Sequence, residues 1–341
     1  MTNEAVYMNK ISFFQPFLPD SSHVETPEHL ISIIREKTFQ YNRDNISRTK
    51  AYQKYYLLHP EIKWSFLASM VSRNAGWNMC DLKGAWFPAV IDKETRKDLF
   101  LTYERANWLI FQDVFPQLLI YHYKTEMDEE MFHLLREFFV SDFMQNEWKR
   151  FREEGDRDRL MQSLIINEQN VIEEPVIQHP VYKRRVFKTK LFFLEDHFHF
   201  SSVVFPTKGG NLYGASVSDF RKLDSRISLG NRLSKILFKE DLYFLFKEFA
   251  LSTEPTGSRR DYERYCKDAP FTGTPLLRTV YGVKEHHIHT PLGDWSQRRK
   301  VKEKWFRRSQ FKEPVKLTKW YFQKQRQLQK LIKIEELFRK E

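Results

Sequence analysis

The chain has 341 residues, of which 41% are hydrophobic and 30% charged, a balance typical of globular proteins and unlike that of disordered ones. Glycine is scarce, at 11 residues, and neither a G-x-x-x-x-G-K-[ST] loop nor a G-x-G-x-x-G turn occurs, which argues against P-loop and dinucleotide-binding enzymes. The formal net charge of +11 arises entirely in residues 295–341, which hold 16 Lys and Arg against 5 Glu.

In chain order, residues 1–25 are predicted to form an N-terminal arm, and residues 26–172 a helical lobe. Thr26 before Pro27 and Glu28 is typical of a helix start, with threonine as N-cap and proline at the first helical position. Proline positions and apolar spacing predict the further helices of this lobe. They cover residues 46–58, 60 to 73 or 74, 96–123 with a kink or break at Pro116, 127–153 and 157–171.

A second, less regular lobe is predicted over residues 173–294. Helices are expected at 216–226 and 231–251, residues 190–205 fit either a helix or a short strand, and 253–294 is rich in loops. Two basic helices, 297–311 and 315–340, hinged at Pro314, make up the predicted basic C-terminus, 295–341. The predicted fold class is therefore predominantly all-α, with an irregular middle and a basic helical extension.

Cysteine usage and hydropathy predict a cytoplasmic protein without a transmembrane segment. Cys80 and Cys266 are far apart and are expected to be free thiols in a reducing compartment. The start of the chain lacks the charge and apolar pattern of a signal peptide. The longest nearly apolar span, residues 106–123, is broken by Asp113 and Pro116 and is too short for a membrane helix.

The stretch from 45 to 84 contains the most distinctive pattern, because an apolar helix runs into the polar cluster Ser72-Arg73-Asn74. One interpretation is structural: the helix ends there, Arg73 bonds the last carbonyls and Gly76 is a left-handed cap. The other is functional: a polar pocket walled in part by tryptophan. Its candidate residues are Arg48, Arg73, Asn74, Trp77, Asn78 and Asp81.

Residues 67–78 followed by Lys83-Gly84-Ala85 also resemble the helix and turn of lysozyme-like lytic transglycosylases. That resemblance places the catalytic glutamic acid of the family at Asn74. An amide cannot donate a proton as a general acid, so glycosidase activity by this route is not expected.

Two further clusters have a functional and a structural interpretation. His286, His287 and His289 are weak metal candidates, because they lack a cysteine partner or an H-E-x-x-H spacing. Ser258, Arg259 and Arg260 are candidates for holding an anion at a helix start, whereas the structural alternative makes Ser258 an N-cap. No metal and no cofactor are predicted, and the sequence favours a non-enzymatic protein.

The basic C-terminus interleaves cations with aromatic side chains, a pattern that suits nucleic acid through phosphate neutralisation and base stacking. The candidate polyanion-binding residues are Arg298, Arg299, Lys300, Lys302, Lys304, Arg307 and Arg308. An anionic membrane surface or an acidic protein partner fits the same pattern. The structural alternative is an amphipathic helix whose apolar stripe packs on the body. That stripe would consist of Leu317, Tyr321, Leu328, Leu331 and Phe338.

The sequence resembles the YppC-like family of Gram-positive, Bacillus-type bacteria. The passages that carry the resemblance are NISRTKAY (45–52), 60–64, MVSRNAGWNMCDLKG (70–84), 167–169 and 256–263. The resemblance implies a cytosolic bacterial protein and supplies no reaction or site residues. The leading hypothesis is a non-enzymatic protein whose basic C-terminus binds a polyanion such as nucleic acid. The alternatives are an enzyme or small-ligand receptor that uses the Arg73–Asp81 pocket, and a structural protein-protein interaction module.

Overall fold

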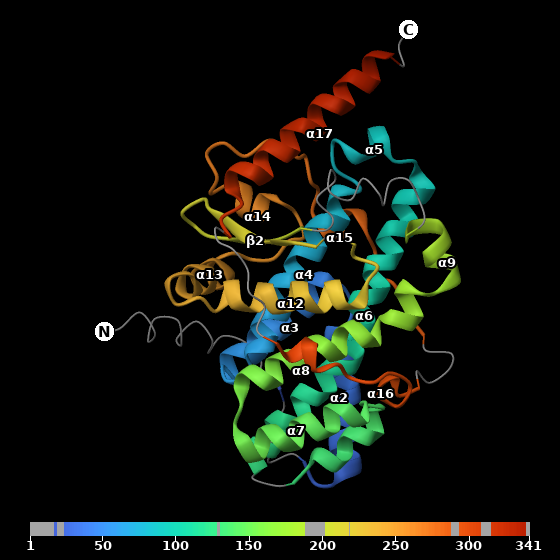
Figure 1. Cartoon of the computed structure of the whole chain (residues 1–341), viewed down its shortest axis with the longest axis vertical. Helices are drawn as coiled ribbons and strands as arrows, with labels where there is room; N and C mark the ends of the chain where they lie inside the picture. The colour runs from blue at the N-terminus through green and yellow to red at the C-terminus, as the bar shows by residue number, and fades with distance from the viewer. Residues whose placement is uncertain are drawn as a thin grey trace.

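The computed structural model describes residues 17–18, 24–127, 130–187, 202–217, 219–287, 293–307 and 315–338. Most of the predicted N-terminal arm lies outside these ranges. Within them the chain is 69% helical and its only sheet is a two-stranded hairpin, which confirms the predicted fold class (Figure 1). No helix in the described ranges has both the length and the apolar character needed to cross a membrane.

The first half of the chain folds into helices joined by short turns. They are α2 (Pro27–Tyr41), α3 (Asn45–Leu58), α4 (Lys63–Asp81), α5 (Phe87–Val90), α6 (Lys93–Met127), the 3-10 helix η2 (Phe132–Phe138), α7 (Asp142–Glu154) and α8 (Arg157–Val171). Thr26 caps α2, because its side chain accepts a hydrogen bond from the His29 N–H, as predicted. The predicted helix over 157–171 is also confirmed, with Asp156 as its N-cap.

The second half is less regular, as predicted. It contains the π-helical turns η3 (Glu173–Ile177) and η4 (Lys183–Phe187), α9 (Pro180–Tyr182), β1 (Ser202–Pro206), β2 (Leu212–Ser216), α12 (Leu223–Leu237), α13 (Glu240–Ser252), α14 (Arg260–Glu263), α15 (Leu277–Val280), α16 (Trp295–Arg298), the 3-10 helix η5 (Glu303–Phe306) and α17 (Thr318–Phe338).

In the first half, one of the two alternatives for Pro116 is excluded and one helix prediction was wrong. Pro116 does not break α6, which runs on to Met127. The single helix predicted over 127–153 is instead divided into η2 and α7. Phe139 adopts a left-handed conformation (φ 57°) that ends η2, and the Ser141 hydroxyl accepts from the Met144 N–H to start α7.

The predicted helices at 216–226 and 231–251 were also placed wrongly. Ser216 belongs to β2, and the helical residues divide into α12 and α13 around Phe238 and Lys239. The ring of Phe238 packs edge-on against Tyr56 and Phe66, so the chain turns to bury it. This long-range contact overrides the continuous apolar spacing from which one helix was inferred.

The predicted basic helix over 297–311 is absent from the residues described there, which form only the short turns α16 and η5. Trp295 and Trp305 are both buried, and their indole N–H groups donate to Asn167 on α8 and Asp224 on α12, respectively. Two anchors on different helices favour an extended strap over a continuous helix. We call residues 293–307 the strap.

Helix α4 lies at the centre of the molecule, where it contacts α3, α6, α8, α12, α15 and β1 (Figure 1). Its side chains are buried around most of the circumference, including Trp64 and Trp77. The hairpin pairs Val204 with Gly214 in antiparallel register, and the segment before α17 extends it, because the Leu317 N–H donates to the Leu212 carbonyl. From this anchor α17 packs along the body near α5, and its C-terminal end extends beyond the rest of the molecule (Figure 1).

Candidate functional site

The polar cluster of α4 does not end the helix, so the interpretation of Gly76 as a cap was wrong. The helix continues through Gly76 to Asp81, and Gly76 packs against Gly257, whose Cα would lie 3.4 Å from a Cβ at position 76. The polar side chains beyond Ser72 are therefore inside the protein, where each needs a hydrogen-bond partner.

Arg73 and Asn74 contact segments that lie far away in the sequence. Arg73 donates to the Ala250 carbonyl at 2.8 Å and to the Gln53 side chain at 3.2 Å, and burial lowers its pKa to about 10. The Asn74 amide donates to the Val204 carbonyl at 2.7 Å and accepts from the Val204 N–H at 2.8 Å. Asn74 thus satisfies both backbone groups of a β1 residue and fixes the hairpin to α4.

The last turn of α4 binds the loop at 253–274 through Arg259. The Arg259 guanidinium donates to the Asp81 carboxylate at 2.7 Å and to the Asn78 side chain at 2.9 Å, and all three residues are buried. Trp77 donates to Asp261 in the same loop at 3.1 Å. Arg259 therefore bridges Asn78 and Asp81, two of the predicted pocket residues. The adjoining cavity measures only about 30 Å³.

The three anion-binding candidates are not equally available. The Ser258 hydroxyl donates to the Thr274 carbonyl and accepts from the Arg260 N–H, a contact close to the predicted capping role. The Arg259 guanidinium already forms an ion pair with the Asp81 carboxylate. Only Arg260 has an exposed side chain.

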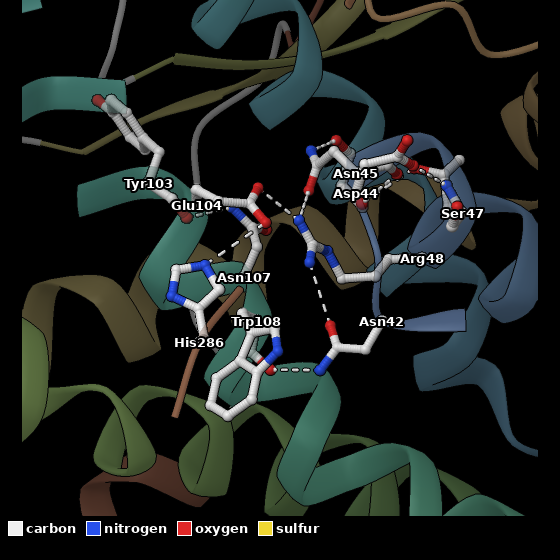
Figure 2. A network of polar contacts seen from close by, with 12 residues as sticks. Asn42, Asp44, Asn45, Ser47, Arg48, Tyr103, Glu104, Asn107, Trp108 and His286 are labelled. Carbon is white, nitrogen blue, oxygen red and sulfur yellow. Dashed lines mark hydrogen bonds and ion pairs between the residues drawn. The ribbon is translucent and has the colours of Figure 1, made fainter. Parts of the chain in front are cut away.

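Arg48 belongs to a different network, between α3 and α6 (Figure 2). Its guanidinium lies 2.6 Å from the Glu104 carboxylate and also donates to the side chains of Asn42 and Asn45. Arg48 and Glu104 are both almost fully buried. The other Glu104 oxygen has no hydrogen bond and faces the His286 Nε2 at 3.8 Å.

The histidine cluster does not gather metal ligands in the part of the chain that is described. His286 packs on the Trp108 ring, His287 is exposed and His289 lies outside the described residues. The residues described contain no group of three His, Cys, Asp or Glu side chains that could hold a metal ion.

Asp113 on α6 combines a carboxyl of raised pKa with a position on a cavity, as the titratable groups of functional sites commonly do. One of its oxygens accepts from the Asn167 amide at 2.6 Å and from the Gln117 amide at 2.8 Å. Burial raises the pKa of this carboxyl from 3.8 to about 7, although both amide hydrogen bonds lower it. Asp113 also lines a cavity of about 330 Å³ between α6, α8, η2 and the strap.

Sequence reasoning overlooked both Asp113 and Glu104. Asp113 was noted only as an interruption of an apolar span. A single acid inside an apolar helical stretch is itself a signal, because the helix must bury it, pair it or turn it toward a cavity.

The strap uses most of the predicted polyanion-binding residues to dock onto the body. Arg298 lies 2.7 Å from the Glu174 carboxylate, Arg299 donates to the Asn170 side chain, and Lys302 and Lys304 both pair with Asp224. The remaining described candidates, Lys300 and Arg307, are exposed, and Arg308 lies outside the described residues.

Helix α17 presents a different set of cations. Tyr321, Gln325, Leu328 and Ile332 are buried, so this face packs on the body as the structural alternative predicted for Tyr321 and Leu328. The opposite face exposes four cations. They are Lys319, Arg326, Lys330 and Lys333.

The Arg48–Glu104 pair yields a prediction about stability. Arg48→Met or Glu104→Leu alone leaves a buried charge without its partner and should cost about 3–5 kcal/mol of unfolding free energy. The double variant should lose at least about 2 kcal/mol less than the sum of the two, as measured by urea unfolding. Strictly additive losses would show that the two charges do not depend on each other.

Asp113 yields a prediction about pH dependence. Its pKa is raised on folding, so the folded state holds the proton more tightly, and the associated stability is lost as pH rises from about 4 to about 7. Asp113→Asn keeps an oxygen for the two amide donors and removes the titration. The unfolding free energy of wild type relative to this variant should fall by about 1.4 kcal/mol per pH unit in that window. Parallel pH profiles for the two proteins would contradict the assignment.

Comparison with known proteins identifies the family. Residues 40–331 match the family model described as "Protein of unknown function (DUF2515)". The chain is similar to "Uncharacterized protein YppC" of Bacillus subtilis (strain 168), with 48% identity over 311 residues, which cover 91% of this chain and 97% of the relative. No solved structure matches. The chain therefore belongs to the DUF2515 family.

Proposed function

We propose that this protein binds nucleic acid through the exposed face of α17 that carries Lys319, Arg326, Lys330 and Lys333. The observation that carries the proposal is their spacing of seven, four and three residues. At about 100° per residue these positions fall within an arc of roughly 60° on one side of the helix.

The charge on this face is available to an outside partner. None of the four cations forms an ion pair with a carboxylate among the described residues, and Arg326 donates only to the Asp268 carbonyl. They extend along about 21 Å of helix axis, over which duplex DNA carries about 12 phosphate charges. The strap cations, in contrast, are largely paired with Glu174 and Asp224.

The packing of α17 favours nucleic acid over a membrane surface. A helix that lies in a bilayer interface must insert its apolar face among the lipids. In α17 the residues of that face, Tyr321, Leu328 and Ile332, are already buried on the body. Trp320 is 38% exposed and lies about 100° around the helix from Lys319, at the side of the basic face, where an aromatic surface can support base stacking.

The proposal predicts salt-dependent binding of oligonucleotides that depends on these four side chains. We expect replacement of all four by glutamine to lower the slope of log affinity against log salt by about 3, because four phosphate contacts are lost. Fluorescence anisotropy with single-stranded and duplex oligonucleotides across a salt titration measures this slope.

A matched control removes the same charge elsewhere. Lys93, Lys97, Lys149 and Arg157 are exposed on α6, α7 and α8, and their replacement by glutamine should leave most of the slope intact. An equal effect of both quadruple variants, or no binding by wild type at low salt, would contradict the proposal. Binding to polyglutamate in place of oligonucleotides would point to an acidic protein partner instead.

A further inference from the structure

We propose that the 330 Å³ cavity that Asp113 helps to line binds a small organic cation, an amine carried on an apolar body. This site lies among α6, α8, η2 and the strap and is separate from the basic face of α17. The inference goes beyond the proposed nucleic-acid function and does not depend on it.

The orientation of the Asp113 carboxyl is fixed by its two amide partners. The Gln117 side-chain oxygen accepts from the Trp148 indole at 2.9 Å, and the Asn167 oxygen accepts from Trp295 at 2.8 Å. Both amides must therefore turn their NH₂ groups toward Asp113, and both donate to the same carboxylate oxygen. The second oxygen has no donor among the described residues, and Asp113 is one of the residues that line the cavity.

Two carboxyls of the cavity lining, Asp113 and Asp294, receive hydrogen bonds only from neutral donors in the described ranges. Besides Asp113, Asp294 lines the space, and its oxygens accept from the backbone and hydroxyl of Ser296 and from the Asp142 N–H. The nearby Arg298 is already paired with Glu174. A positively charged group near Asp113 and Asp294 would thus supply the charge compensation that these two carboxyls lack.

The rim also carries charges that a ligand must accommodate. Arg299 donates to the Asn170 side chain, and Arg35 donates to the Glu137 carbonyl. The whole lining contains three arginines (Arg35, Arg298 and Arg299) and four carboxyls (Asp113, Glu137, Glu174 and Asp294), a net charge of −1 when all seven are ionised. The lining therefore has a small excess of negative charge, and Asp113 and Asp294 form no ion pair among the described residues.

The walls of the cavity suit an apolar body. Leu109, Val171, Phe138, Phe139 and Trp295 contribute apolar surface, and aromatic faces attract cations as well. Phe139 is held in the left-handed region and its side chain is 70% exposed, an arrangement that costs free energy and places an aromatic ring at the rim. A volume of 330 Å³ lies at the lower end of the range for small-molecule sites.

Phenethylamine is a suitable probe, with 3-phenylpropionic acid as a matched anion. We expect isothermal titration calorimetry of the full chain to show binding of the amine and at least about tenfold weaker binding of the acid. Binding near pH 7 should release protons, which calorimetry detects as a dependence of the heat on the buffer. Asp113→Asn should weaken amine binding by about 10- to 100-fold and abolish the proton release.

Two further variants keep the test decisive. Glu168→Gln removes another partly buried carboxyl whose pKa is raised to about 7. Glu168 accepts hydrogen bonds from Trp64 and Gln169 and does not line the cavity, so amine binding should persist. Val171→Phe narrows the cavity from the α8 wall and should block binding without changing charge. Equal binding of the acid, retention of binding in Asp113→Asn, or no amine binding by wild type would overturn the proposal.

Discussion

The structure depends on the burial of the polar side chains in the second half of α4. The second half of α4 carries Arg73, Asn74, Asn78 and Asp81 into the interior, and burial of these groups is favourable only when their hydrogen-bonding needs are met. Three segments supply the partners: Arg73 donates to the end of α13, Asn74 bonds strand β1, and Asn78 and Asp81 both accept from Arg259. Two Arg73 nitrogens have no hydrogen bond among the described residues, and its guanidinium lies over the Phe249 ring. Elements far apart in the sequence are thereby held in fixed positions around one helix.

Two carboxyls, the buried Glu104 and the partly buried Asp113, connect α6 to its neighbours. Glu104 is paired with Arg48, whereas Asp113 receives only neutral amide donors. Pairing offsets the cost of burying a carboxylate, whereas a carboxyl without a cation is costly at neutral pH. Such a cost at a cavity is typical of a site at which a ligand completes the environment.

Local sequence signals predicted the starts of α2 and α8, but they could not predict the long-range contacts. Thr26 and Pro27 specify the start of α2 from adjacent residues alone, so no knowledge of the fold was needed. The continuation of α4 past Asn74 could not be inferred in this way, because its partners Val204 and Ala250 come much later in the chain. The same reason explains the strap, whose basic residues were read as a free surface although Glu174 and Asp224 pair with several of them.

Charge in the C-terminal region therefore has two roles that composition alone does not separate. The strap cations help to dock the chain on the body, and the α17 cations remain exposed on a face supported by its buried apolar side. Packing of one face of α17 gives the other face a fixed direction, so its charges project as an array and not as a disordered tail.

Hydrogen exchange of the α4 amides tests most directly whether this helix organises the protein. The account predicts that amides at 75–81 exchange as slowly as those at 64–72, because both halves are buried and open only with global unfolding. Fast exchange at 75–81, as at a frayed helix end, would show that the helix stops at the polar cluster and would contradict the account.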